Sequence, residues 1–233
     1  PDNFAGGTRE GRPLNLMGTV YHGGYVVGLI FTLMFTVIAL SIERYFALRT
    51  AFGKGSLTKF VQEVKAAVKA NDFAKARALC DKQQGSVANV VLASVNTYSE
   101  MENTTGIKKS QKVAKIQQAH EEATQLEMPT LQMNLPIIAT IVTLGTLTAL
   151  FGTVLGMIGS FQALAAGGGG DSLALSMGIS EALVNTASGI ATSWVAVVAY
   201  NTYTNKIDKL TYALDEVGYT IAQTYEANHT EEA

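Results

Sequence analysis

The sequence predicts an all-α integral membrane protein with three long transmembrane helices and a helical cytoplasmic domain. Its 233 residues are 48% hydrophobic and only 15% charged, whereas an average soluble domain has about 25% charged residues. Lysine and arginine are absent from two long stretches, between Arg12 and Arg44 and between Lys115 and Lys206. Both are longer than the roughly 20 apolar residues that a helix needs to cross a bilayer.

Three candidate spans lie within these stretches. The first, about residues 24–42, has no charge before Glu43 and Arg44. The second, about residues 137–166, has no charge at all, and the third, about residues 172–205, has one acidic residue, Glu181. A soluble helical bundle would show a polar face at helical period in every helix. The first two spans have no charged face, so we expect them to lie in lipid.

The distribution of positive charge predicts the orientation. Most of the 17 lysine and arginine residues lie in the segment between the first two spans, and the tail begins with Lys206 and Lys209. By the positive-inside rule the N-terminus is expected outside, and the middle segment and the tail inside. The predicted segments are a periplasmic segment 1–22, transmembrane helix 23–43, cytoplasmic helical domain 44–133, transmembrane helix 134–166, periplasmic hairpin loop 167–171, transmembrane helix 172–205 and cytoplasmic C-terminal helix or tail 206–233.

The middle segment is expected to be helical. Apolar residues recur in it at helical spacing, with charges between them: Phe60, Val64, Ala67, Val68, then Phe73, Ala76, Leu79 and Cys80. The cluster Asn103–Gly106 predicts a break before a long polar helix over about 107–128. Some lysines of this segment are expected either to be solvated or to contact anionic lipid headgroups, so membrane lipids are expected partners of the chain. These lysines are Lys59, Lys65, Lys69 and Lys75.

The second span carries small and hydroxyl side chains at helical spacing. The hydroxyl residues are Thr143, Thr146, Thr153 and Ser160, and the small residues at four-residue spacing are Gly152, Gly156 and Ser160. Small residues allow close approach of helices in lipid, so we expect the glycines to serve packing. For the threonines, packing and a polar pathway remain equally open, because a threonine can also bond its own backbone.

Glu181 favours the polar pathway. A charged carboxylate inside a membrane is costly and usually marks an ion or proton route; the alternative is a protonated glutamate bonded between helices. Its polar neighbours at or near helical offsets are Asn185, Thr186 and Ser188. If the hairpin turns at residues 167–171, Thr153 lies at the depth of residues 181–186 in an adjacent antiparallel helix, because each residue rises about 1.5 Å.

Several classes of function are not expected. A net charge of −2 and a pI near 6.0 give no basic excess for nucleic acid. The single cysteine, Cys80, has no disulfide or zinc partner in the chain. Gly167–Gly170 is followed by no Lys-Ser/Thr pair and predicts a turn, not a phosphate loop. Neither a cofactor nor a metal is predicted, and an enzyme is least expected, since the histidines are scattered: His22, His120 and His229.

Four motifs resemble the MotA, TolQ and ExbB family of proton-driven motor subunits. They are Phe151–Phe161, Gly178–Ile190, the Tyr200–Asn201 pair and Ile42–Arg44. Three spans with an outer N-terminus resemble the ExbB/TolQ branch, and within it ExbB is favoured. The resemblance implies that Thr153 and Thr186 are the paired pore threonines and that Glu181 is the intramembrane glutamate. Asn185 and Thr146 complete the expected proton pathway.

The sequence departs from the family pattern at three positions. Thr146 and Val195 stand where prolines are common, and Ala149 stands where a glycine is usual. Helix kinks implied by those prolines are therefore not expected to transfer to this chain.

The resemblance implies an assembly in the inner membrane of a Gram-negative bacterium. Such subunits form a homo-oligomeric ring, a pentamer in the best-described cases, around two copies of an ExbD-like single-span partner whose aspartate carries the proton. The last two spans line the pore and the first lies outermost. A TonB-like protein then carries the work to outer-membrane receptors.

Three alternatives remain open at this point. A TolQ-like subunit of an envelope-constriction motor would have the same spans and motifs. A self-sufficient homo-oligomeric proton channel would conduct without a partner, and a non-conducting scaffold would tolerate Glu181→Gln. Flux measured with and without the partner separates the last two from the motor.

Overall fold

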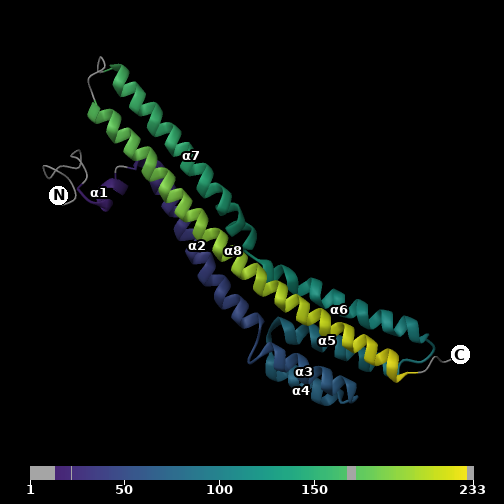
Figure 1. The fold of residues 1–233 in the computed structure, drawn as a ribbon. Helices are drawn as coiled ribbons and strands as arrows, with labels where there is room; N and C mark the ends of the chain where they lie inside the picture. Colours follow the sequence, from purple (N-terminus) through teal and green to yellow (C-terminus); the bar gives the residue numbers. More distant parts are fainter. Residues whose placement is uncertain (1–13, 22, 167–171, 230–233) are drawn as a thin grey trace. The chain divides into compact units, whose positions relative to one another are not determined.

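The computed structural model describes residues 14–21, 23–166 and 172–229 (Figure 1). Within these ranges every regular element is an α-helix, and three helices are long and apolar enough to cross a membrane. The predicted fold class is therefore confirmed. The expected hairpin loop 167–171, with Gly167–Gly170, lies outside the described residues, as do residues 1–13 and His22 of the expected N-terminal segment.

The helices follow one another with short connections. In chain order they are α1 Leu16–Tyr21, α2 Gly24–Ala51, α3 Leu57–Lys69, α4 Phe73–Gln83, α5 Gly85–Asn103, α6 Lys109–Gln132, α7 Leu135–Ala166 and α8 Ser172–Asn228. Two helices run beyond the spans expected for them: α2 continues from 43 to Ala51, and α8 passes the expected boundary at 205/206 without a break. Hydropathy marks where the apolar part of a helix ends, which is a different place from the end of the helix.

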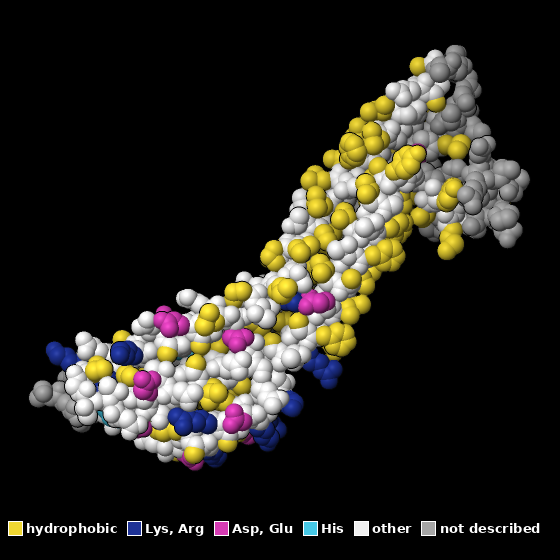
Figure 2. Space-filling view, turned by 180° about the vertical axis from the view of Figure 1, so that it is seen from behind, with side chains coloured by type: hydrophobic (Ala, Val, Ile, Leu, Met, Phe, Trp, Pro, Cys, Tyr) yellow, Lys and Arg dark blue, Asp and Glu magenta, His cyan; other side chains and the backbone are white. Residues whose placement is uncertain are grey.

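The chain divides into two compact units. The first, which we call the apolar unit, contains Pro1–Ile42 and Asn134–Asn201. The second, which we call the charged unit, contains Glu43–Met133 and Thr202–Ala233. Hydrophobic side chains dominate the visible surface of the first, whereas lysine, arginine, aspartate and glutamate gather on the second (Figure 2).

In the apolar unit, α7 and α8 approach through small residues. A Cβ added at Gly178 would lie 2.0 Å from Ser160 Oγ, and one added at Gly189 would lie 2.2 Å from Ala149 Cβ. Gly156 would meet the Gly178 carbonyl oxygen at 3.1 Å. Such close approach is how membrane helices gain packing contacts, so the packing role predicted for Gly156 and Ser160 is confirmed.

Large apolar side chains cover the outer surface of the same unit. Examples on α2, α7 and α8 are exposed: Phe35, Leu150, Phe151, Leu183 and Trp194. This inversion, with small residues inside and large apolar residues outside, suits a bilayer because lipid tails solvate apolar surface as well as another helix does.

In the charged unit, α3 to α6 and the C-terminal part of α8 surround an apolar core. The periodic residues Phe60, Val64, Ala67 and Val68 of α3 are buried, as predicted. Tyr98 and Tyr225 stack edge to face with ring centroids 4.8 Å apart, an arrangement that aromatic pairs favour. The predicted break is also confirmed, since α5 ends at Asn103 and α6 begins at Lys109.

Arg44 ties the start of the charged unit together. Its side chain is 3% exposed and forms an ion pair with Glu43, in which Nε donates to Glu43 Oε2 at 2.6 Å. Nη1 also donates to the Thr130 carbonyl oxygen at 3.1 Å, near the end of α6. A buried guanidinium needs such partners because its desolvation is costly, so α2 and α6 are fixed to each other here.

Candidate functional site

The hydroxyls of Thr153 on α7 and Thr186 on α8 bond to each other at 2.5 Å. Each hydroxyl also lies within hydrogen-bonding distance of a backbone carbonyl oxygen of its own helix, Thr153 of Ala149 at 2.9 Å and Thr186 of Ala182 at 3.1 Å. Because a hydroxyl has one hydrogen, one threonine donates to the other while the second donates to its own helix. Thr153 Oγ1 further lies 3.2 Å from the Ala182 carbonyl oxygen across the interface. The two threonines thus lie at one depth in antiparallel helices, as the hairpin arithmetic predicts.

A second hydroxyl pair continues this arrangement. Thr146 Oγ1 lies 2.9 Å from Ser193 Oγ. Thr146 precedes Thr153 by seven residues and Ser193 follows Thr186 by seven. The two pairs are therefore about two helical turns, or roughly 10 Å, apart along the helices. We call the two pairs the hydroxyl ladder. Ser193 was not predicted, although its spacing from Thr186 could have indicated it.

Ser160 lies seven residues from Thr153 in the other direction. Its hydroxyl donates to the Gly156 carbonyl oxygen at 2.8 Å, and the side chain is buried against Gly178. No cross-helix hydroxyl faces it among the described residues, so it contributes to packing. Thr143, at the far end of the predicted stripe, is exposed.

Glu181 lies apart from the hydroxyl ladder, against the first residue of α2. A Cβ added at Gly24 would lie 2.2 Å from Glu181 Oε1. The first N–H groups of a helix carry a partial positive charge, which favours a carboxylate there. With Tyr25, Ser160 and Gly178, Glu181 also lines a cavity of about 420 Å³ within the apolar unit.

Asn185 faces the interior of the apolar unit. It is fully buried, and a Cβ added at Gly152 would lie 2.8 Å from its Cγ and 2.7 Å from Val26 Cγ1. Within the described part of the chain, its amide oxygen and nitrogen have no hydrogen-bond partner. A buried amide without a partner costs about 1–3 kcal/mol, and buried water commonly satisfies such groups.

The structure therefore sorts the five predicted site residues into two sets. Thr146, Thr153 and Thr186 form the hydroxyl ladder between α7 and α8. Glu181 and Asn185 lie one turn apart on α8, Glu181 against Gly24 of α2 and Asn185 against Gly152 of α7. Hydroxyl groups can donate and accept at once, so each of the two pairs can take part in proton transfer, although the gap of roughly 10 Å between the pairs is too long for a direct transfer.

Within residues 14–21, 23–166 and 172–229, no three histidine, cysteine, aspartate or glutamate side chains cluster closely enough to hold a metal ion.

Comparison with known proteins gives one family. The model of the MotA/TolQ/ExbB proton channel family matches residues 84–216, more than half of the chain, and this region includes the hydroxyl ladder and Glu181. The chain is similar to the Tol-Pal system protein TolQ of Pseudomonas aeruginosa, with 25% identity over 222 residues, which cover 91% of each chain.

Two further relatives match shorter regions. A putative biopolymer transport protein ExbB-like 3 of Synechocystis is 34% identical over 87 residues, which cover 36% of this chain and 41% of the relative. The Tol-Pal system protein TolQ of Haemophilus influenzae is 32% identical over 84 residues, covering 36% and 37%.

Three observations point to the same family: the three long apolar helices, the polar side chains within them, and the match over residues 84–216. The chain belongs to the MotA/TolQ/ExbB proton channel family, and it is a multi-pass membrane protein that acts as a transport component and not as an enzyme.

Proposed function

We propose that the chain is a ring-forming subunit of a motor in the inner membrane, driven by the proton-motive force. It works with an ExbD-like single-span partner and energises TonB-dependent import across the outer membrane. The observation that carries this proposal is the hydroxyl ladder, Thr146–Ser193 and Thr153–Thr186, between two otherwise apolar helices. Family membership supports the ExbD- or TolR-like partner.

In this proposal the hydroxyl ladder is a polar track beside the carboxylate of the partner. Thr146 is exposed and Thr153 half-buried in the single chain, so a helix placed against α7 and α8 would meet them. Glu181, which lines the cavity of about 420 Å³ in the apolar unit, is the intramembrane carboxyl group of the proposed proton pathway. Asn185 holds water between α2, α7 and α8, because its amide has no described protein partner.

The proposed orientation is N-terminus periplasmic and C-terminus cytoplasmic. Positive charge supports it: most lysine and arginine residues fall in the charged unit, and positively charged loops stay on the cytoplasmic side. The exposed apolar side chains of α7 and α8 are the surfaces that would contact lipid, neighbouring subunits of a pentamer or the partner helix.

Proton flux in liposomes tests the proposal. The protein is reconstituted with and without its single-span partner, as wild type, as Glu181→Gln and as Thr153→Val plus Thr186→Val. The matched control is Thr32→Val plus Thr36→Val, because both of these α2 hydroxyls bond only to their own helix in the described structure.

Flux that requires the partner, falls in the two site variants and persists in the control supports the motor. Conduction by the wild type alone would replace it with a self-sufficient homo-oligomeric proton channel. If the site variants behave like the wild type while the assembly conducts, the hydroxyl ladder and Glu181 serve packing, and the proton-pathway roles are wrong.

A TolQ-like role in an envelope-constriction motor is the second candidate. One observation favours it: the similarity to TolQ of Pseudomonas aeruginosa extends over 91% of both chains, whereas the ExbB-like relative matches 36% of this chain. Complementation separates the two roles. Rescue of TonB-dependent uptake in a strain without its own ExbB supports the import motor, and rescue of envelope integrity in a strain without TolQ supports the constriction motor.

A further inference from the structure

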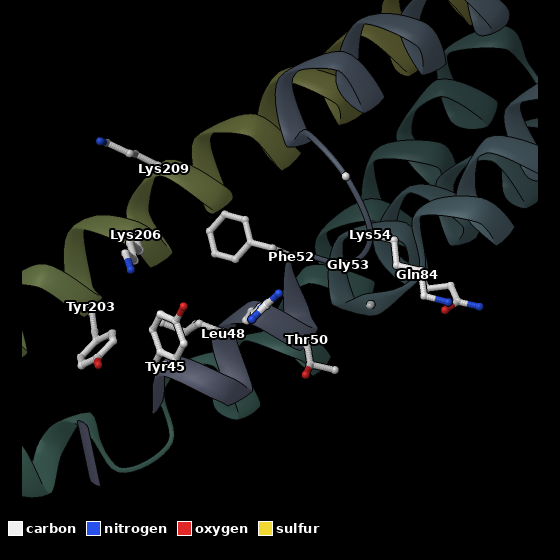
Figure 3. A pocket seen from close by; sticks show the side chains of 13 residues that line it. Tyr45, Leu48, Thr50, Phe52, Gly53, Lys54, Gln84, Tyr203, Lys206 and Lys209 are labelled. Carbon is white, nitrogen blue, oxygen red and sulfur yellow. The ribbon is translucent and has the colours of Figure 1, made fainter. Parts of the chain in front are cut away.

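A cavity of about 1000 Å³ opens in the charged unit, away from the hydroxyl ladder (Figure 3). Its lining comes from the last turns of α2, the connection to α3, the junction of α4 and α5, and α8. This volume lies at the upper end of the range typical of small-molecule sites, about 300–1000 Å³. The proposed proton pathway uses none of the lining residues.

Four cationic side chains line this cavity: Arg49, Lys54, Lys206 and Lys209. The lining contains no aspartate or glutamate. In the described part of the chain none of the four forms an ion pair. Several uncompensated cations around one concave space raise the local positive potential and attract anions.

Two tyrosines hold Lys206 in the cavity. Its Nζ lies 5.8 Å from the ring centroid of Tyr45 on α2 and 5.8 Å from that of Tyr203 on α8. Figure 3 shows the Lys206 amine pointing toward the two rings, while Lys209 points outward. A cation within about 6 Å of an aromatic face is attracted to it, so the ammonium group is positioned before any ligand arrives.

Direct backbone contacts fix one wall of the cavity. Gly53 and Gly85 have φ values of 75° and 82°, which glycine adopts without strain. A Cβ at Gly53 would lie 2.1 Å from the Gln84 carbonyl oxygen, and one at Gly85 would lie 2.6 Å from that of Thr50. Only glycine allows this approach, so the end of α2 and the start of α5 form a rigid wall.

The cavity lies where two apolar helical runs end. Tyr45 follows Ile42, the last residue of the charge-free part of α2, by three positions, and Lys206 is the first charge of α8 after Glu181. At about 1.5 Å per residue these groups lie within one or two turns of the hydrocarbon boundary. Tyrosine is enriched at that depth. Leu48 and Phe52 add apolar surface to the same lining.

From this combination we infer that the cavity binds the headgroup of an anionic phospholipid from the adjacent leaflet. The phosphodiester lies among Arg49, Lys54 and Lys206, and the apolar side chains contact the glycerol and the first acyl carbons. Arginine and lysine are the usual partners of a phosphate group. Basic pockets beside transmembrane helices recognise such lipids.

Lipid retention by the complete assembly tests this inference. The protein is purified in mild detergent, and bound phosphatidylglycerol, cardiolipin and zwitterionic phosphatidylethanolamine are measured by native mass spectrometry and by titration. The cavity variant is Arg49→Gln plus Lys206→Gln. The matched control is Arg77→Gln plus Lys59→Gln, which removes the same charge from exposed residues of the same unit outside the cavity.

Wild type and control are expected to retain anionic lipid in preference to phosphatidylethanolamine. The cavity variant should bind it about thirtyfold more weakly, from the attraction of two cations near a membrane surface. An equal loss in cavity variant and control would overturn the inference in favour of general surface attraction. Absence of any preference for anionic lipid would also overturn it.

Two further arms keep the test decisive. Inorganic phosphate added at millimolar concentration should leave lipid retention unchanged; displacement would assign the cavity to a soluble anion instead. If the double variant does not assemble, Lys206→Gln and Lys206→Arg replace it. Retention in Lys206→Arg with about fivefold weaker binding in Lys206→Gln supports the lipid site, and equal binding by the two excludes Lys206 from it.

Discussion

Replacing Gly189 by alanine is expected to destabilise the contact between α7 and α8. The added methyl group would lie 2.2 Å from Ala149 Cβ and 2.6 Å from the Gly145 carbonyl oxygen. Unstrained carbon atoms approach to about 3.5–4.0 Å. The two helices would therefore have to separate by roughly 1.3 Å or more at this point.

The magnitude follows from two opposing effects. Overpacking a close contact costs about 1–3 kcal/mol, whereas alanine in place of glycine favours the helix by about 1 kcal/mol. The net loss is therefore about 0–2 kcal/mol, or a factor of up to roughly 30 in the unfolding equilibrium constant. We expect the upper part of this range, because the added Cβ would lie less than 3.0 Å from two atoms of α7. Gly28→Ala on α2 is the matched control, because a Cβ there meets nothing within 4 Å, so only the favourable helical effect applies.

Reversible unfolding of the purified protein in mixed micelles of detergent and sodium dodecyl sulfate measures both variants. Gly189→Ala should unfold at lower dodecyl sulfate and Gly28→Ala at equal or higher dodecyl sulfate than the wild type. Adding Ala149→Gly to Gly189→Ala should recover part of the loss, since it removes the nearer of the two clashes. Equal behaviour of Gly189→Ala and Gly28→Ala, or no coupling with Ala149→Gly, would refute the close-contact reasoning.

Three further outcomes are expected. Burial lowers the pKa of His120 below its ordinary 6.5, although Asp215 on α8 and Glu121 on its own helix oppose the shift. The unfolded chain therefore binds more protons than the folded chain, so thermal stability should fall as the pH drops below about 6.5. In thermal scans from pH 7.5 to 5.5, His120→Gln should flatten that dependence. Burial, together with Asp81, raises the pKa of the Cys80 thiol to about 12, so maleimide should label it at pH 8 only after unfolding, and rapid labelling of the native protein would contradict the burial. Gln84 has φ 57° and ψ 175°, a region nearly exclusive to glycine, so Gln84→Gly should stabilise the protein by about 1 kcal/mol, seen as a higher melting temperature; a lower one would show that its backbone is not strained.

The helices and their small-residue contacts were predictable from the sequence because each depends on local composition. Charge-free runs predicted the three spans, and four-residue spacing predicted the packing of Gly156 and Ser160. The depth of Thr153 relative to Thr186 followed from the hairpin and the helical rise alone. Predicting such features does not require the three-dimensional arrangement of the helices.

The surroundings of Glu181 and Asn185 could not be predicted in the same way. Their spacing puts them on one strip of α8, yet spacing does not say which neighbour that strip meets. In the structure Glu181 meets Gly24 of α2, more than 150 residues earlier in the chain, whereas Asn185 meets Gly152 of α7. The cavity around Lys206 is likewise beyond sequence reasoning, because Tyr45 and Tyr203 come from distant helices.

The hydroxyls that bond to their own helix bear on how related sequences should differ. Thr32, Thr36 and Thr140 each donate to the carbonyl four residues earlier, so exchange with valine or alanine leaves no orphaned group and such positions are free to drift. The pairs 153/186 and 146/193 also bond across two helices, so losing one hydroxyl removes a contact between α7 and α8. Among relatives that keep this interface, we expect the two residues of each pair to be substituted together. Threonines that bond only to their own helix should be substituted independently of other positions.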